Sequence, residues 1–171
     1  MQDSVGDIDL YYFDESGFSL TPVIPYAWQP VNTHILVVPQ KSKRINVLGF
    51  FKRDNTFIPY MIEGTVDSES AIACFDHFCT TLTKKTVVVL DNAPIHTSDP
   101  FQAKIPLWKA QGLTLKFLPK YSPELNCIEI LWKHIKYYWL PFSAYLNFKC
   151  LQEALTNILI NIGKDYRISF A

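Results

Sequence analysis

Short apolar runs and longer stretches of helical spacing alternate along the chain. In the first part, the runs at 8–13, 45–51 and 56–62 have the length and the β-branched and aromatic content of strands. A polar turn at 52–55 joins the last two, which predicts an antiparallel hairpin. Residues 18–40 contain four prolines, and we expect a loop-rich insert there with short edge strands.

The second part of the chain changes period. Apolar residues recur at helical spacing over 68–82, and the continuous apolar run at 87–90 predicts a strand buried on both faces. A weaker helical pattern at 101–111 is interrupted by Pro106, so we expect only one or two turns beginning there. A fifth strand is predicted at 113–118.

Two amphipathic helices, at 124–139 and about 148–162, complete the pattern. The apolar stripe predicted for the first consists of Leu125, Ile128, Leu131, Trp132, Ile135 and Tyr138. Three meandering strands followed by strand–helix–strand crossovers predict one mixed sheet with helices on both faces. This α/β arrangement is compatible with a ribonuclease H-like fold, and we expect residues 1–171 to form a single domain.

Composition restricts the class of protein. Hydrophobic residues make up 49% of the chain and aromatic residues 15%, which excludes a disordered chain. The acidic start at 1–9 lacks the basic and apolar regions of a signal peptide, and no apolar run reaches the roughly 20 residues that span a bilayer. We therefore expect a cytoplasmic protein. The four cysteines include no C-x-x-C pair, which favours reduced thiols over zinc ligands.

Charge is unevenly distributed although the formal net charge is +0. Residues 1–40 hold five acids and no lysine or arginine, so all 16 basic residues fall in 41–171. A basic surface beside a group of carboxylates is compatible with binding of a polyanion, but an asymmetry of this size also arises by chance.

Two predicted strands end in an aspartate, Asp14 and Asp91. Ligands of open α/β sheets gather where strands end, and two adjacent carboxylates there would repel each other unless a cation joined them. Mg²⁺ suits such a pair because it takes oxygen ligands from few carboxylates and leaves room for water and phosphate. The helix at 124–139 offers a third acid, Glu124 or Glu129. Taken singly, each acid also has an ordinary interpretation as a turn, cap or solvated helix residue.

These acids stand in three long motifs. The motifs read FDESG at 13–17, LDNAPIH at 90–96 and LPKYSPELNCIE at 118–129. Together with AWQP at 27–30, they resemble the mariner superfamily of DDE transposases, and within it the bacterial insertion-sequence branch. The resemblance covers about 7–140. It implies that Asp14, Asp91 and Glu129 form the metal-binding catalytic triad of a DDE domain.

The chain departs from the family pattern at several positions. Cys127 stands where the family usually has proline, and Val31 and Asn32 replace the usual lysine and glycine. The interval from Asp91 to Glu129 is slightly longer than the one that names the mariner group. Family members have N-terminal helix-turn-helix domains, and we expect no such domain in the residues before the first motif.

The resemblance implies phosphoryl transfer with two Mg²⁺ ions, for which Mn²⁺ can substitute. The expected substrates are transposon ends and target DNA, and the expected assembly is a homodimer. His96 and Asn92 are candidate supporting residues; His96 either orients Asp91 or substrate, or caps the next segment. The candidates for phosphate contacts are Lys43, Arg44, Lys120, Lys133 and Lys136.

Three functions stay open at this point. The first is an active nuclease that works with a separate helix-turn-helix chain. The second is an inactive remnant of a decayed element, and the third is a non-enzymatic DNA- or protein-binding module with the same fold. The intact triad argues against loss of chemistry, whereas the missing domain argues for loss of targeting.

Overall fold

One five-stranded sheet organises the molecule. The computed structural model describes residues 8–21, 43–119 and 122–170. The strands are β1 (Asp9–Phe18), β2 (Ile45–Phe51), β3 (Phe57–Glu63), β4 (Thr86–Leu90) and β5 (Leu113–Phe117). Their order in the sheet is β3-β2-β1-β4-β5; β1, β2 and β3 pair antiparallel, and β4 and β5 run parallel to β1. The predicted mixed sheet is confirmed.

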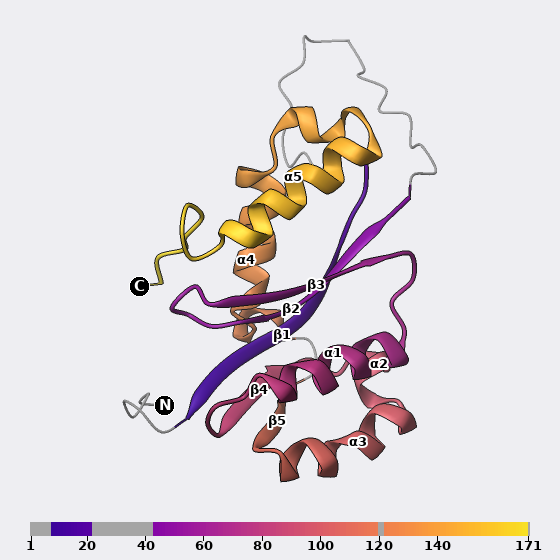
Figure 1. The fold of residues 1–171 in the computed structure, drawn as a ribbon, viewed down its shortest axis with the longest axis vertical. Helices are drawn as coiled ribbons and strands as arrows, with labels where there is room; N and C mark the ends of the chain where they lie inside the picture. Colours follow the sequence, from indigo (N-terminus) through magenta and orange to yellow (C-terminus); the bar gives the residue numbers. More distant parts are fainter. Residues whose placement is uncertain (1–7, 22–42, 120–121, 171) are drawn as a thin grey trace.

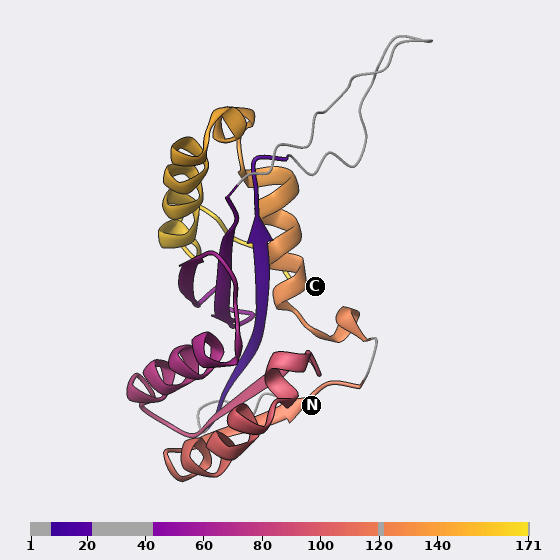
Figure 2. The ribbon, with the colours of Figure 1, turned by 90° about the vertical axis from the view of Figure 1, so that its right-hand side faces the viewer.

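Helices follow the strands in two groups. The α-helices are α1 (Ser68–Thr80), α2 (Pro94–Thr97), α3 (Asp99–Ala110), α4 (Ile128–His134) and α5 (Phe148–Asn161). Shorter turns are η1 (Pro123–Leu125), the π-helical η2 (Ile135–Trp139) and η3 (Phe142–Leu146). Figures 1 and 2 show α1 to α3 gathered around the start of the long strand β1, and α4 and α5 beside its far end.

The central strands separate two hydrophobic cores. Tyr11 and Phe13 of β1 pack with α1 and α3, whereas Phe18 packs with α4 and α5. Every residue of β2 is buried, and Phe50 and Phe51 enter opposite cores. Because successive residues of a strand point to opposite faces, this burial pattern requires helices on both sides of the sheet. The predicted arrangement of helices on both faces is confirmed.

The structure corrects two predicted boundaries, the end of the first strand and the extent of the helix around Pro106. Strand β1 continues to Phe18, past the predicted end at Asp14, because its antiparallel pairing with β2 extends that far. Helix α3 runs through Pro106 without stopping. Phe101 and Trp108, on either side of the proline, are buried against Phe75, with ring centroids 5.2 and 5.0 Å away. This packing offsets the helix hydrogen bond that proline cannot donate.

The predicted helix over 124–139 is wrong as a continuous element. It consists of η1, a break at Asn126, α4 and the π-helical η2. Asn126 has an extended backbone, and its buried side chain donates a 3.2 Å hydrogen bond to the carbonyl of Phe13. Leu125 and Tyr138 are therefore exposed and do not belong to the apolar stripe. Glu129 lies in the first turn of α4 and not in a second turn.

Most of the predicted loop-rich insert, including AWQP at 27–30, lies outside the described residues. Within the described ranges, no helix combines the length and apolar character that a membrane crossing requires.

Candidate active site

The register of the sheet brings Asp14 and Asp91 together. Tyr12 pairs with Val89 in the parallel ladder, and β4 ends one residue later at Leu90. Continuing that register places Asp14 level with Asp91, at the point where β1 loses its parallel neighbour but keeps its antiparallel one. Asp91 therefore follows a strand end as predicted, whereas Asp14 lies inside a strand beside that end.

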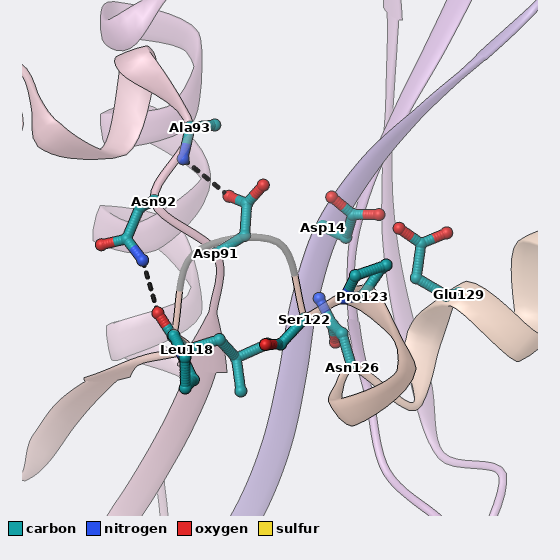
Figure 3. A pocket seen from close by; sticks show the side chains of 10 residues that line it. Asp14, Asp91, Asn92, Ala93, Leu118, Ser122, Pro123, Asn126 and Glu129 are labelled. Atoms are coloured by element: carbon teal, nitrogen blue, oxygen red, sulfur yellow. Dashed lines mark hydrogen bonds between the residues drawn. The ribbon is translucent and has the colours of Figure 1, made fainter.

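Glu129 reaches the same place from α4. The break at Asn126, tied to the carbonyl of Phe13, fixes the start of this helix against β1. One turn further on, the indole nitrogen of Trp132 donates a 3.0 Å hydrogen bond to Oδ2 of Asp14. Figure 3 shows the carboxyl group of Asp14 between those of Glu129 and Asp91. Three separate elements thus present their acids to one space.

A cleft of about 420 Å³ contains all three acids. The other residues that line it are Asn92, Ala93, Leu118, Pro119, Ser122, Pro123 and Asn126. Among the described residues, no three acids, histidines or cysteines surround one point closely enough to hold a single ion. Mg²⁺ needs only one or two carboxylates and completes its shell with water and phosphate, so an all-protein cage is not required. The oxygen donors along this cleft fit hard divalent cations.

Asp14 is the most perturbed acid of the cleft. Burial raises its pKa to about 8, and the negative charges of Glu129, Glu15 and Asp91 add to the effect. No lysine or arginine of the described chain forms an ion pair with it. A buried carboxylate among other acids, with no ion pair of its own, is stabilised in its charged form by a bound cation.

Asp91 is fixed by its own turn. Its Oδ1 accepts a 3.0 Å hydrogen bond from the backbone N–H of Ala93 and lies 2.9 Å from Nδ1 of His96. The hydrogen bond with His96 lowers the pKa of Asp91. The amide of Asn92 donates to the carbonyl of Leu118, which joins this turn to the end of β5. Both candidate supporting residues therefore have defined contacts.

A second hollow adjoins the cleft and is lined by cations. Asp14 and Glu129 border both spaces, and Arg44, Lys133 and Lys136 line the second one. The guanidinium of Arg44 lies against Gly17, where any side chain would collide with it. Burial lowers the pKa of Lys136, and the charge of Arg44 lowers it further.

The remaining basic candidates lie elsewhere. Lys43 is exposed and its Nζ lies 5.6 Å from the ring centroid of Phe148, and it lines neither hollow. Lys120 lies outside the described residues. Sequence reasoning did not single out Asn126 or Glu15. The position of Glu15 beside Asp14 was the available signal for the latter, whereas nothing local predicts the contact of Asn126 with β1.

Comparison with solved structures defines the fold. A Mos1 transposase paired-end complex with left transposon end aligns with a TM-score of 0.68 at 13% identity, over 88% of this chain and 47% of that one. A mariner Mos1 paired-end complex with Mg gives 0.65 at 14%, over 92% and 49%. The catalytic core domain of BIV integrase gives 0.55 at 17%, over 94% and 86%. These similarities show a ribonuclease H-like fold, as predicted.

The family follows from the sequence itself. The model of the family described as DDE superfamily endonuclease matches residues 9–152, and the chain belongs to this family. The chain spans about half the length of the Mos1 chains that it resembles. No curated protein matches the sequence.

Proposed function

We propose that the chain is a transposase catalytic domain that cleaves DNA and joins strands with two divalent metal ions held by Asp14, Asp91 and Glu129. One observation supports this proposal above the others. Acids from β1, from the turn after β4 and from α4 line a single cleft, and a hollow lined by cations adjoins it. Neither feature is needed for a stable sheet, and both suit a metal-dependent reaction on a polyanion.

The side chains around the acids limit the ways in which they can bind ions. Trp132 holds Oδ2 of Asp14, and the N–H of Ala93 together with His96 holds Oδ1 of Asp91. In this proposal the other oxygen of each aspartate binds the metal. Bound ions would supply Lewis acidity at the attacking and leaving oxygens of a phosphodiester. In this mechanism the attacking group is water or a DNA 3′-hydroxyl, and no covalent protein–DNA intermediate forms.

The hollow that contains Arg44, Lys133 and Lys136 gives the proposed path of the DNA backbone. Its cations lie beside Asp14 and Glu129. A DNA phosphate bound to these cations would therefore place the next phosphodiester of the strand close to the acids. Such contacts position DNA without reading its sequence. Lys43 is not part of this path.

The solved neighbours favour particular ligands. Mos1 paired-end complexes are known with Mg and with Mn, and one contains the left transposon end. We extend these ligands to this chain as Mg²⁺, for which Mn²⁺ can substitute, and transposon-end DNA. We also propose a homodimer and DNA-end recognition by a separate helix-turn-helix chain. Membership of the bacterial insertion-sequence branch stays a prediction.

Nicking of supercoiled plasmid in Mg²⁺ tests the function. We expect wild type to nick DNA in Mg²⁺ and not in EDTA, and Asp91→Asn to lose activity. The exposed Asp165→Asn is the matched control and should retain it. Cleavage that persists in Asp91→Asn overturns the triad. If wild type and Asp91→Asn both bind DNA but neither cleaves it, the chain is a binding module. If wild type neither binds nor cleaves DNA, the chain is an inactive remnant.

A further inference from the structure

His96 is a fully buried imidazole beside the proposed site. Its side chain is 0% exposed, and its ring packs against Phe13 and Phe101 with centroids 5.5 Å away in each case. Its Nδ1 lies 2.9 Å from Oδ1 of Asp91. Packing on both sides and a hydrogen bond at one nitrogen fix the orientation of the ring, and therefore the direction of the second nitrogen.

That second nitrogen faces Glu15. Nε2 of His96 lies 3.6 Å from Oε2 of Glu15. Within the described chain, both atoms are buried and neither has a hydrogen-bond partner. A buried polar atom without a partner costs about 1–3 kcal/mol. Because the two atoms are only 3.6 Å apart and the Glu15 side chain is 29% exposed, a small rotation of that side chain would bring them into hydrogen-bond distance and remove both penalties.

We propose that Glu15 is a positioning residue for Asp91 and acts through a hydrogen bond between its Oε2 and Nε2 of His96. The hydrogen-bonded side chains of Glu15, His96 and Asp91 then hold the carboxylate of Asp91 toward the cleft. The bond needs one proton between Oε2 and Nε2: with Nδ1 donating to Asp91, the carboxyl group of Glu15 donates it to a neutral His96, or Nε2 donates it when both ring nitrogens carry a proton. This inference rests on the proposed role of Asp91 as a metal ligand.

The geometry of β1 explains why Glu15 supports a ligand while Asp14 is one. Consecutive residues of a strand point to opposite faces of the sheet. Asp14 meets Trp132 of α4, whereas Glu15 meets His96 of α2 on the other face. Strand β1 therefore supplies both a proposed ligand and the support of a second proposed ligand, which lies just after the neighbouring strand β4.

Asp91 needs such support because its side chain is 51% exposed. An exposed carboxylate samples several rotamers, and holding it in one lowers the entropy lost when a metal binds. Partners that orient metal ligands typically contribute about 10–100-fold in metal affinity.

Mn²⁺ binding in the absence of DNA, measured from the loss of the free-ion signal in electron paramagnetic resonance, tests the inference. We expect Glu15→Leu to weaken Mn²⁺ binding about 10–100-fold. Glu15→Gln should stay within about threefold of wild type, because its amide donates to a neutral Nε2. Glu153→Leu, an exposed glutamate on α5, is the matched control and should bind as wild type does.

A double-mutant cycle separates action through His96 from direct ligation. His96→Asn keeps a donor toward Asp91 and removes the group that faces Glu15. In that background Glu15→Leu should cause no further loss of Mn²⁺ affinity. A full additional loss would make Glu15 a direct ligand and would overturn the positioning role. If Glu15→Leu does not fold, Glu15→Ser gives the same comparison.

The outcomes also separate this inference from the proposed function. Wild type that binds no Mn²⁺, or Asp91→Asn that binds it normally, contradicts the proposed metal site itself. A different pattern overturns the inference alone: wild type binds Mn²⁺, Asp91→Asn binds it weakly, and Glu15→Leu binds it as wild type does. That pattern leaves the proposed metal site intact.

Discussion

Strand β1 holds two aspartates in opposite electrostatic surroundings. Near its start, Asp9 forms ion pairs with Lys52 at 2.9 Å and with Lys84 at 3.2 Å. Five residues later, Asp14 accepts a hydrogen bond from Trp132 and lies among acids that raise its pKa, while Lys136 attracts it without forming an ion pair. The same side chain on the same strand is thus ion-paired with two lysines at one end, whereas at the other end it forms no ion pair with any described residue.

The pKa values of the two aspartates move in opposite directions. Burial alone would raise the pKa of Asp9, but the hydrogen bonds and charges of Lys52 and Lys84 outweigh it and lower that pKa. At Asp14, burial and the neighbouring acids act together and raise the pKa to about 8. An acid that is ion-paired with lysines, as Asp9 is, contributes to the stability of the fold. An acid with a strongly raised pKa in a cleft marks a candidate functional site.

The largest expected effect is on catalysis. Asp14→Asn should reduce Mg²⁺-dependent nicking by at least about 10³-fold, which corresponds to roughly 4 kcal/mol of transition-state stabilisation. Asp9→Asn, on the same strand, should retain activity within about threefold. Initial nicking rates at saturating Mg²⁺ make the comparison. Equal losses in the two variants would show that the difference between the two ends of β1 has no catalytic meaning.

The sequence predicts the layout of the fold because the layout depends on local periodicity. Apolar runs identify all five strands, and β2 occupies the predicted residues. Boundaries that depend on distant partners are not predictable in this way. The end of β1 is set by its pairing with β2, and the continuation of α3 through Pro106 is set by packing of Trp108 against α1.

The candidate site shows the same difference between features that local sequence predicts and features that depend on distant segments. The motifs single out Asp14, Asp91 and Glu129 as candidates because each acid has a recognisable sequence context, and the structure brings all three to one cleft. Contacts between segments escape prediction. The approach of Glu15 to His96 joins two motifs that lie far apart in the chain, and neither motif predicts it. Lys43 is basic in sequence, but the fold places it over Phe148.

The second expected effect is on stability in Mg²⁺. At pH 8, Mg²⁺ at 100 times its dissociation constant should stabilise the wild type by about 2.7 kcal/mol, or roughly 5–10 °C in Tm. Asp14→Asn should gain less than about a third of this, whereas Asp9→Asn should gain as much as wild type. Thermal unfolding with and without Mg²⁺, at matched ionic strength, measures it. An identical gain in Asp14→Asn would exclude Asp14 as a ligand.

The third effect is a loss of stability at the other end of the strand. Asp9→Asn should lower the free energy of unfolding at pH 7 by about 1–2 kcal/mol, since Asp9 is 18% exposed and bonded to two lysines, one of them substantially exposed. The folded-state pKa of Asp9 is lowered, so its contribution exists above its unfolded pKa and is lost as the pH falls through the folded value. Urea unfolding should show the variant converging with wild type in acid. A constant difference at every pH would contradict the ion pairs.

The smallest effect has the opposite sign and belongs to Asp14. In EDTA, its raised pKa stabilises the fold fully below the unfolded value near 3.8, and this contribution is lost as the pH rises through about 8. Between pH 5 and 8.5, wild type should therefore lose about 1 kcal/mol relative to Asp14→Asn, because solvent in the open cleft weakens the full effect. Urea unfolding of both proteins across this range isolates Asp14, since Glu15 and the other groups titrate in both. A difference that does not change with pH, or one in which wild type gains stability as the pH rises, would show that Asp14 is compensated in the cleft as Asp9 is by its lysines.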